Sequence, residues 1–309
     1  MKKNKDRETK KELKTLITRK WPEGELTTQQ KIWWYGWLFL RAVAPLLLYA
    51  VMPSLCLCIG YVFGGYEDRG MTFEAFFTYG ANFYTTVGTF LTLWILNRRA
   101  KRRGSDIFKE STLFVKELRP LKSIGFFAFG FASAIAVSAF LTLMPEFFLT
   151  RDYSNASGAT DFGRDVIFSM LTLLVLAPVV EEIVFRGHML NTLLEHVSER
   201  RSILISSIIF ALMHVNPVWM LYSFLLGHIL AKTSMKEDNI AYGVLLHIGF
   251  NLTAAVNHFT TADPEVSQAL YNGKWKIFIY GILGLAISLA LAGLYTGRID
   301  IRKYRRVKV

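Results

Sequence analysis

The chain has 309 residues, of which 52% are hydrophobic, 14% aromatic and only 19% charged. An ordinary soluble domain carries about 25% charged residues. Here the apolar residues are gathered into long blocks, several of which match the roughly 17 to 25 residues that span a bilayer as a helix. The composition therefore excludes an ordinary soluble protein and predicts an all-α, polytopic membrane protein.

The net charge of +12 has a simple explanation in such a protein. Lys and Arg cluster in the loops and tails, as they do on the cytoplasmic side of membrane proteins. No aromatic-basic platform or helix-turn-helix pattern accompanies the charge, so nucleic-acid binding is not expected. Cys56 and Cys58 are two residues apart in an apolar block. Positions two apart do not face each other on a helix, so these cysteines are not expected to form a disulfide.

In chain order, a basic tail (1–36) precedes about eight predicted spans. The tail ends in a tryptophan-rich stretch typical of a membrane interface. The predicted spans cover 37–63, 76–96, 123–148, 165–194, 202–215, 217–231, 240–259 and 275–295. Lys and Arg are far more numerous in the loops on the side that holds both termini, so both ends are predicted to be cytoplasmic. The fifth and sixth spans are short and could be re-entrant.

Few ionisable side chains fall in the central parts of these spans. An ionisable group within a span is costly and is a functional candidate by default. Glu181 and Glu182 are the only acids there. Glu182 and Arg186 are four apart, so they share a helix face and can form an ion pair. Glu181 points about 100° away and can face a cavity.

A carboxylate in a partly dry pocket suits a general base that acts on water near neutral pH. The two acids could instead join helices, or bind an ion in a transporter. His214, in Phe210-Ala211-Leu212-Met213-His214, stands at the end of an apolar segment, where a lone histidine is often a packing residue.

His247 and Asn251 are also four apart on one helix face. Side chains so aligned could donate hydrogen bonds to an oxyanion, or they could bridge helices. Glu181, His214 and His247 all fall between the middle and the inner half of the predicted bilayer. They could therefore converge in one cavity that faces the cytoplasm.

Three motifs in this order resemble those of a known family. They are Glu181-Glu182-x-x-x-Arg186, Phe210-x-x-x-His214 and His247-x-x-x-Asn251. They resemble the signature motifs of the type II CAAX-prenyl-protease and bacteriocin-processing family, the Abi or CPBP intramembrane proteases. The resemblance covers about residues 165–259.

The resemblance implies a role for each motif residue. Glu181 would activate water with the help of His214. The oxyanion would be stabilised by His247 and Asn251, while Glu182 and Arg186 would hold the site together. The family has been described both as metal-dependent and as glutamate-dependent. We favour a metal-free site, because the chain has no His-Glu-x-x-His signature. The alternative is Zn²⁺ held by Glu181, His214 and His247, a three-ligand set with an open position.

The predicted organisation has four parts: the cytoplasmic tail (1–36), the first three spans (37–160), a catalytic core with four helices (161–260), and the last span with a basic tail (261–309). The expected activity is cleavage of a membrane-associated protein or peptide near the cytoplasmic face of a bacterial plasma membrane. A non-catalytic scaffold and an ion-coupled transporter are the alternatives. The absence of an internal repeat weakens the transporter. The N-terminal tail could also bind a cytoplasmic partner.

Overall fold

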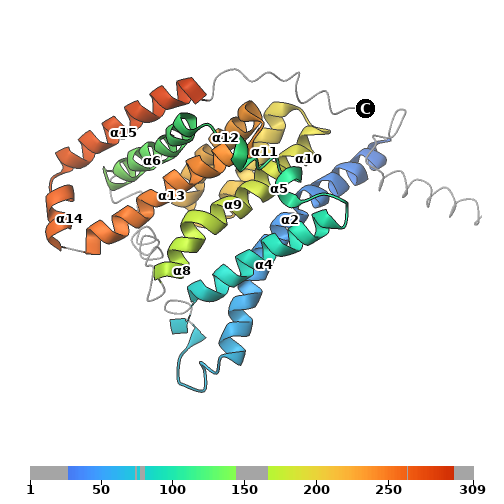
Figure 1. Cartoon of the computed structure of the whole chain (residues 1–309), viewed down its shortest axis with the longest axis horizontal. Helices are drawn as coiled ribbons and strands as arrows, with labels where there is room; N and C mark the ends of the chain where they lie inside the picture. The colour runs from blue at the N-terminus through green and yellow to red at the C-terminus, as the bar shows by residue number, and fades with distance from the viewer. Residues whose placement is uncertain (1–26, 74, 77–80, 144–165, 263, 296–309) are drawn as a thin grey trace, which may run out of the picture. The chain divides into compact units, whose positions relative to one another are not determined.

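The structure is a computed structural model that describes residues 27–73, 75–76, 81–143, 166–262 and 264–295. All regular structure in these ranges is helical, which confirms the all-α prediction (Figure 1). The chain divides into two units, 1–44 and 45–309. Most of the N-terminal tail, the polar loop before residue 166 and the basic C-terminal tail lie outside the described residues.

In the first unit, the described residues form the beginning of helix α2 (Thr28–Phe63). This helix starts nine residues earlier than the predicted span, at a capping box. The side chain of Gln30 accepts a hydrogen bond from the Thr27 amide at 2.9 Å, and the Thr27 hydroxyl accepts one from the Gln30 amide at 3.3 Å. Farther along, the Arg41 guanidinium lies 5.6 Å from the centre of the Trp37 ring.

Five helical stretches are long and apolar enough to cross a membrane, and the chain is a multi-pass membrane protein. They are Thr28–Phe63, Pro120–Leu141, Val166–Leu194, Ile240–Asn257 and Trp275–Tyr295. The other predicted spans are also helices: α4 (Ala81–Lys101), α11 (Glu199–Leu212) and α12 (Pro217–Glu237). With 14 residues, α11 is shorter than a usual span. The total of eight spans and the orientation of the termini stay predictions.

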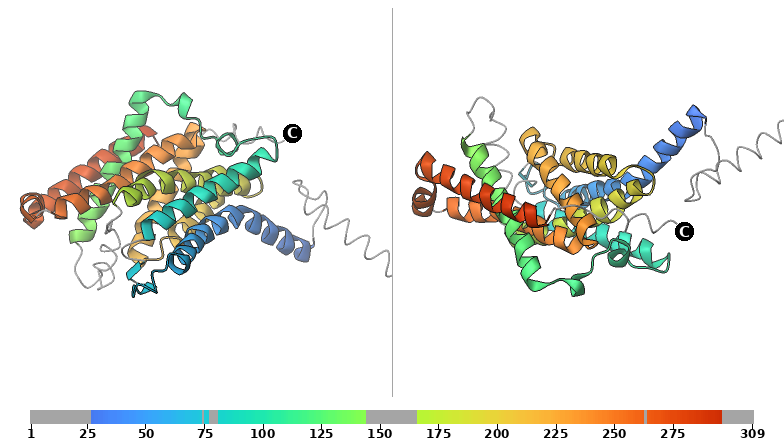
Figure 2. Two further views of the ribbon diagram at one scale, coloured as in Figure 1. Left: turned by 60° about the horizontal axis from the view of Figure 1, so that its bottom comes forward. Right: turned by 90° about the horizontal axis from the view of Figure 1, so that it is seen from above.

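Close contact between helices fixes the position of α13 (Ile240–Ala262). It packs against α6 (Pro120–Leu143), whose other neighbour is α15 (Lys274–Tyr295) (Figures 1 and 2). A Cβ atom on Gly130 of α6 would lie 1.8 Å from the carbonyl oxygen of Leu246, and one on Gly249 of α13 would lie 2.1 Å from that of Phe127. Small residues let membrane helices approach this closely. The two contacts flank His247.

The predicted helix over 165–194 is continuous, but it widens twice into a π-helix. Three α-helical pieces, α8 (Val166–Leu171), α9 (Ala177–Glu182) and α10 (Asn191–Leu194), alternate with two π-helical pieces, η2 (Thr172–Leu176) and η3 (Ile183–Leu190). Such wide turns are frequent at functional sites. The candidate acids Glu181 and Glu182 lie between the two π segments.

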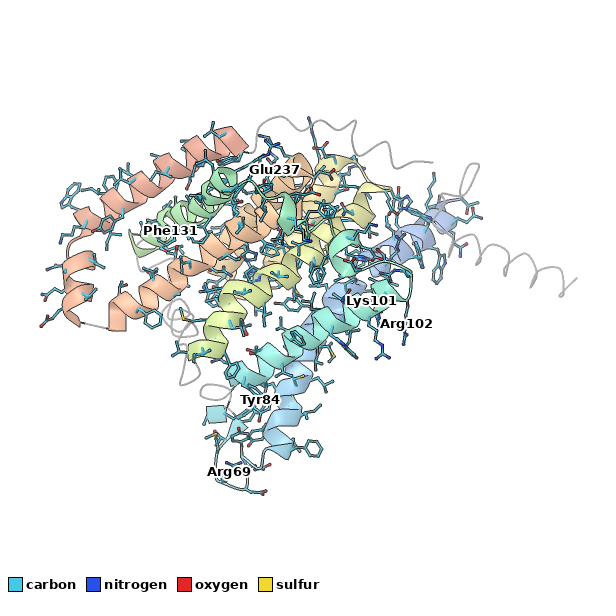
Figure 3. All side chains as sticks on the ribbon, viewed as in Figure 1. Arg69, Tyr84, Lys101, Arg102, Phe131 and Glu237 are labelled. Carbon is cyan, nitrogen blue, oxygen red and sulfur yellow. The ribbon has the colours of Figure 1, made fainter. Side chains whose placement is uncertain are left out.

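Short elements complete the described chain. They are α5 (Ile107–Glu110), the 3₁₀ turn η1 (Val115–Glu117) and α14 (Pro264–Tyr271). The loop around η1 is tied to the turn before α13, because the side chain of Asn239 exchanges two hydrogen bonds with the backbone of Phe114, at 2.9 and 3.1 Å. Lys122 forms an ion pair with Glu237, the last residue of α12. Glu237 is labelled in Figure 3.

Candidate functional site

A buried ion pair forms the centre of the site. The Glu182 side chain is 0% exposed, and its Oε1 atom accepts a hydrogen bond from Nη1 of Arg186 at 2.8 Å. The spacing of four residues predicts this pairing. From the other side of the guanidinium, Nη2 donates to the carbonyl oxygen of Gly227 on α12 at 3.1 Å. The pair therefore joins the α9–η3 helix to α12.

An aromatic ring covers this pair. The Arg186 guanidinium lies 4.5 Å from the centre of the Phe210 ring, an attractive cation–π geometry. Phe185 meets the same ring edge to face at 5.0 Å. A Cβ atom on Gly227 would approach Phe210 to 3.1 Å, so the glycine allows α12 to come close enough for its carbonyl to reach Arg186. The Phe210 ring and the Gly227 carbonyl thus add to the partners of the buried guanidinium, beside Glu182.

Glu181 has a different environment from its neighbour. Its side chain is 18% exposed. Its Oε1 atom accepts a hydrogen bond from the Tyr49 hydroxyl at 3.1 Å, and its Oε2 atom lies 3.8 Å from Nε2 of His247. Tyr49 belongs to the second unit of the chain, on the later part of α2. The Glu181 carboxylate is thus held from two sides and still reaches the surface.

His247 lies between the two carboxylates. Its Nε2 atom faces Glu181, and its Nδ1 atom is 3.4 Å from Oε1 of Glu182. The 3.8 Å contact is too long for a hydrogen bond, and Nδ1 has no hydrogen-bond partner among the described residues. A protonated ring would pair with both acids, whereas a neutral ring would contact them more weakly. His247 therefore couples the two acids across α9 and α13.

His214 is the predicted site residue that stands apart. Its Nδ1 atom is 2.9 Å from the carbonyl oxygen of Phe210. A carbonyl only accepts, so Nδ1 carries the proton and Nε2 keeps its lone pair in the neutral ring. The Phe210 ring contacts His214 at 4.9 Å and His247 at 5.8 Å. Within the described residues, Phe210 links His214 to the acids. Direct assistance of Glu181 by His214 stays a prediction.

A strained turn follows His214. Val215 has a φ of 57°, a left-handed conformation that is a genuine outlier for a β-branched residue. The next residue, Asn216, caps α12: its Oδ1 atom accepts from the amides of Val218 and Trp219 at 2.9 and 3.3 Å. Pro217 then occupies the first helical turn, where its missing N–H costs nothing. This turn joins α11 to α12, and His214 lies in it, two residues beyond the end of α11.

Asn251 lies one turn after His247 and is tethered to the first π segment. Its Nδ2 atom donates to the carbonyl oxygen of Leu173, in η2, at 2.9 Å. The amide has a second N–H, which this contact does not use. The bond ties α13 to the helix that carries the two acids.

The predicted zinc ligands do not form a metal-binding group. In the part of the chain that the structure describes, no three His, Cys, Asp or Glu side chains are placed to hold a metal ion together. Glu181 and His247 are neighbours, while His214 lies beyond the Phe210 ring. As the described residues are placed, these three side chains do not gather as a three-ligand zinc site requires, and the dependence on zinc stays a prediction.

Sequence reasoning missed two residues of the site. Tyr49 stands in an apolar segment far from the motifs, and its only signal is a hydroxyl within a predicted span. Phe210 belongs to a motif, but no role was predicted for it. The structure places its ring against Arg186, His214 and His247.

Comparison with known families agrees with the motifs. Residues 163–253 match the family model described as type II CAAX prenyl endopeptidase Rce1-like. This segment is therefore similar to that family. It contains every predicted site residue, from Glu181 to Asn251, so the resemblance predicted from the three motifs is confirmed.

Two curated relatives match a longer part of the chain at low identity. An Escherichia coli protein described as an uncharacterized 24.3 kDa protein is 29% identical over 130 residues, which cover 40% of this chain and 58% of that protein. The UPF0177 protein YxdF of Lactococcus lactis is 26% identical over 125 residues, covering 37% of this chain and 69% of that protein. No solved structure matches the chain.

Proposed function

We propose that this chain is an intramembrane endopeptidase that hydrolyses a peptide bond of a membrane-associated protein or peptide near the cytoplasmic face. The observation that carries the proposal is the contrast between the adjacent acids. Glu182 is fully buried and bound to Arg186, whereas Glu181 is partly exposed and held by Tyr49 and His247. Similarity of the segment to an endopeptidase family adds support.

In the proposed reaction, Glu181 acts as the general base. Its carboxylate takes a proton from water while the water oxygen attacks the scissile carbonyl carbon. The carbonyl electron pair moves onto oxygen, and the resulting oxyanion accepts hydrogen bonds from His247 and Asn251. When the C–N bond breaks, the leaving nitrogen takes the proton from Glu181. The products are a new carboxyl end and a new amino end.

The buried pair has a supporting role in this proposal. Two carboxylates on consecutive residues repel each other, and a low dielectric strengthens that repulsion. Arg186 supplies the compensating charge at 2.8 Å from Glu182. With Glu182 committed to Arg186, Glu181 remains available to water. We assign His214 a secondary role, in which the lone pair on Nε2 accepts a proton or a hydrogen bond from a substrate group.

The first test compares newly formed protein and peptide termini in membranes that contain the wild type, Glu181→Gln or Glu117→Gln at matched levels. Glu117 is an exposed acid on η1 and serves as the control. We expect termini that appear with the wild type and with Glu117→Gln but disappear with Glu181→Gln, because an amide cannot take the proton. They would also identify the substrate.

The opposite result would favour the scaffold. If all three maps agree while Glu181→Gln still supports the wild-type phenotype, catalysis by Glu181 is excluded. A loss of ion flux in Glu181→Gln without any change in termini would instead favour the transporter. Cleavage by the purified protein with and without a chelator then tests dependence on zinc.

A further inference from the structure

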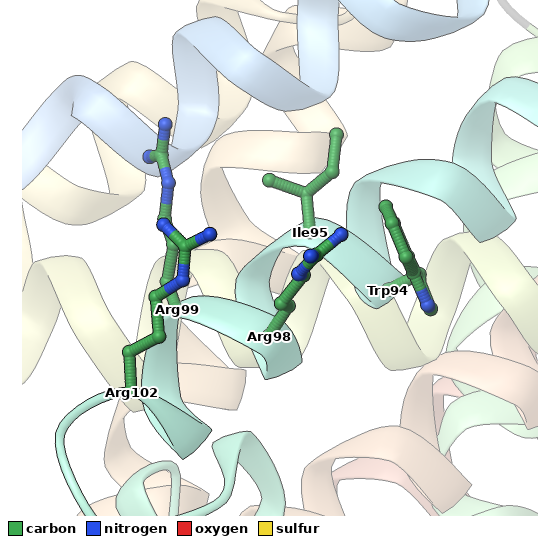
Figure 4. Close-up of a pocket in the computed structure, with 5 residues that line it drawn as sticks. All are labelled: Trp94, Ile95, Arg98, Arg99 and Arg102. Atoms are coloured by element: carbon green, nitrogen blue, oxygen red, sulfur yellow. The ribbon is translucent and has the colours of Figure 1, made fainter.

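A second charged cluster lies at the C-terminal end of α4, where three arginines line an open pocket of about 250 Å³. The lining residues are Trp94, Ile95, Arg98, Arg99 and Arg102. Their spacing places them on one side of the helix (Figure 4). Figure 3 shows Lys101 and Arg102 where α4 ends. Among the residues that the structure describes, no acid lines this pocket.

The charge of the pocket is not cancelled by its lining. Arg103, next along the chain, pairs with Glu110 at 2.5 Å, which accounts for its charge. Arg98 instead lies over Trp94, with its guanidinium 5.2 Å from the ring centre. Stacking in this way holds the flat group in place while its N–H donors stay in the plane, available to an anion. Guanidinium groups bind phosphate oxygens through two parallel hydrogen bonds.

An apolar stripe leads up to the arginines. Phe90 and Trp94 are 58% and 49% exposed, and they precede Arg98 at intervals of four residues. Phe83 continues the same face toward the start of α4 and is also exposed. The surface is thus apolar along the helix and cationic at its end, and a tryptophan stands at the boundary. An anionic membrane lipid complements this surface, because its apolar acyl chain adjoins a negatively charged phosphate headgroup.

We propose that the end of α4 is a binding site for an anionic phospholipid. The phosphate would be held by Arg98, Arg99 and Arg102, and an acyl chain would lie along Trp94 and Phe90. The apolar stripe favours a lipid over free phosphate, because free phosphate has nothing to bury there. Clustered cations immediately beyond a span are suited to such headgroups. The lining residues come from α4 and the residue that follows it, whereas the candidate catalytic acids lie on α9.

The test measures lipid binding to the purified full chain by native mass spectrometry. The probes are phosphatidylglycerol and phosphatidylcholine with the same acyl chains. The variant Arg98→Gln/Arg102→Gln removes two cations from the pocket. The control Arg200→Gln/Arg201→Gln removes two exposed arginines at the start of α11, where no tryptophan adjoins them in sequence. The net charge of the two variants is the same.

We expect the wild type to retain phosphatidylglycerol in preference to phosphatidylcholine. The pocket variant should weaken phosphatidylglycerol binding about tenfold or more, since each cation near a lipid surface contributes to the attraction, and the control should bind like the wild type. Equal losses in both variants would overturn the proposal, because they would show a general effect of charge.

A second experiment distinguishes binding of the whole lipid from binding of its phosphate group alone. Inorganic phosphate should not displace phosphatidylglycerol, and Trp94→Ala should weaken the lipid without creating phosphate binding. If phosphate competes fully and Trp94→Ala has no effect, the pocket is an anion site only and the lipid proposal fails. Tight binding of an oligonucleotide that displaces the lipid would likewise overturn it.

Discussion

Arg186 and the arginines at the end of α4 lie in opposite environments. Arg186 is buried, bonded to Glu182 and to the Gly227 carbonyl, and covered by Phe210. The arginines at the end of α4 are exposed and line a pocket without acids. Burial makes a charge depend on its internal partners, while exposure leaves it available to an external one. The role of Arg186 should therefore be tested by protein stability, and that of the exposed arginines by ligand binding.

The largest expected effect is on the buried group. Arg186→Met should lower the free energy of unfolding by about 3–5 kcal/mol, because Glu182 would stay buried without its counter-charge. Arg99→Met, on the exposed group, should change it by no more than about 0.5 kcal/mol. Thermal unfolding in detergent measures both variants. The double variant Glu182→Leu/Arg186→Met should recover much of the loss, since no unpaired charge remains. If it is no more stable than Arg186→Met, the pairing argument fails.

The next effect concerns the helix that carries His247. Gly249→Ala should lower the free energy of unfolding by about 1–3 kcal/mol, because the new methyl group would meet the backbone of α6. Gly293→Ala is the matched control: a Cβ atom there meets nothing within 4 Å, so better helix propensity should leave stability equal or higher. Cleavage should fall only in Gly249→Ala. Equal behaviour of the two variants would show that the α6–α13 contact does not position His247.

A smaller effect is expected at Tyr49. Tyr49→Phe removes one hydrogen bond to Glu181, and we expect kcat to fall about tenfold with little change in KM, since hydrogen bonds to charged groups contribute about 1.5–3 kcal/mol. Tyr61→Phe, also on α2, removes a hydrogen bond to the Met71 carbonyl. It controls for a general loss of stability. A fall in kcat of the same size in both variants would argue against positioning of Glu181 by Tyr49.

Local spacing explains how much of this site the sequence could predict. Glu182 pairs with Arg186 because residues four apart share a helix face, a rule that needs no tertiary information. The three-motif resemblance likewise located the family segment. Tyr49 could not be found this way, because its contact with Glu181 spans 132 positions and depends on how α2 packs.

The limits of the fold prediction have a similar cause. Apolar blocks identify helices, and each of the eight predicted segments has helical structure in its described part. Hydropathy does not register the winding of a helix, so the π segments on both sides of Glu181 and Glu182 were not predicted. The positive φ of Val215 also contradicts the usual preference of its residue type.

The smallest expected effect has the opposite sign. Val215 is 83% exposed and has a φ of 57°, so its side chain contributes little packing and strains the backbone. Asparagine tolerates this conformation. Val215→Asn should therefore raise the free energy of unfolding by about 1 kcal/mol, whereas Val115→Asn, at another exposed valine, should not.

The cleavage rate of Val215→Asn tests whether the strained turn matters for activity. Val215→Asn keeps the turn that holds His214 beyond the end of α11, so cleavage should stay within about twofold of the wild type. A stabilised variant with much slower cleavage would show that strain at Val215, and not the turn alone, holds His214 in its working position. That result would assign His214 a direct role in the reaction in place of the secondary one proposed above.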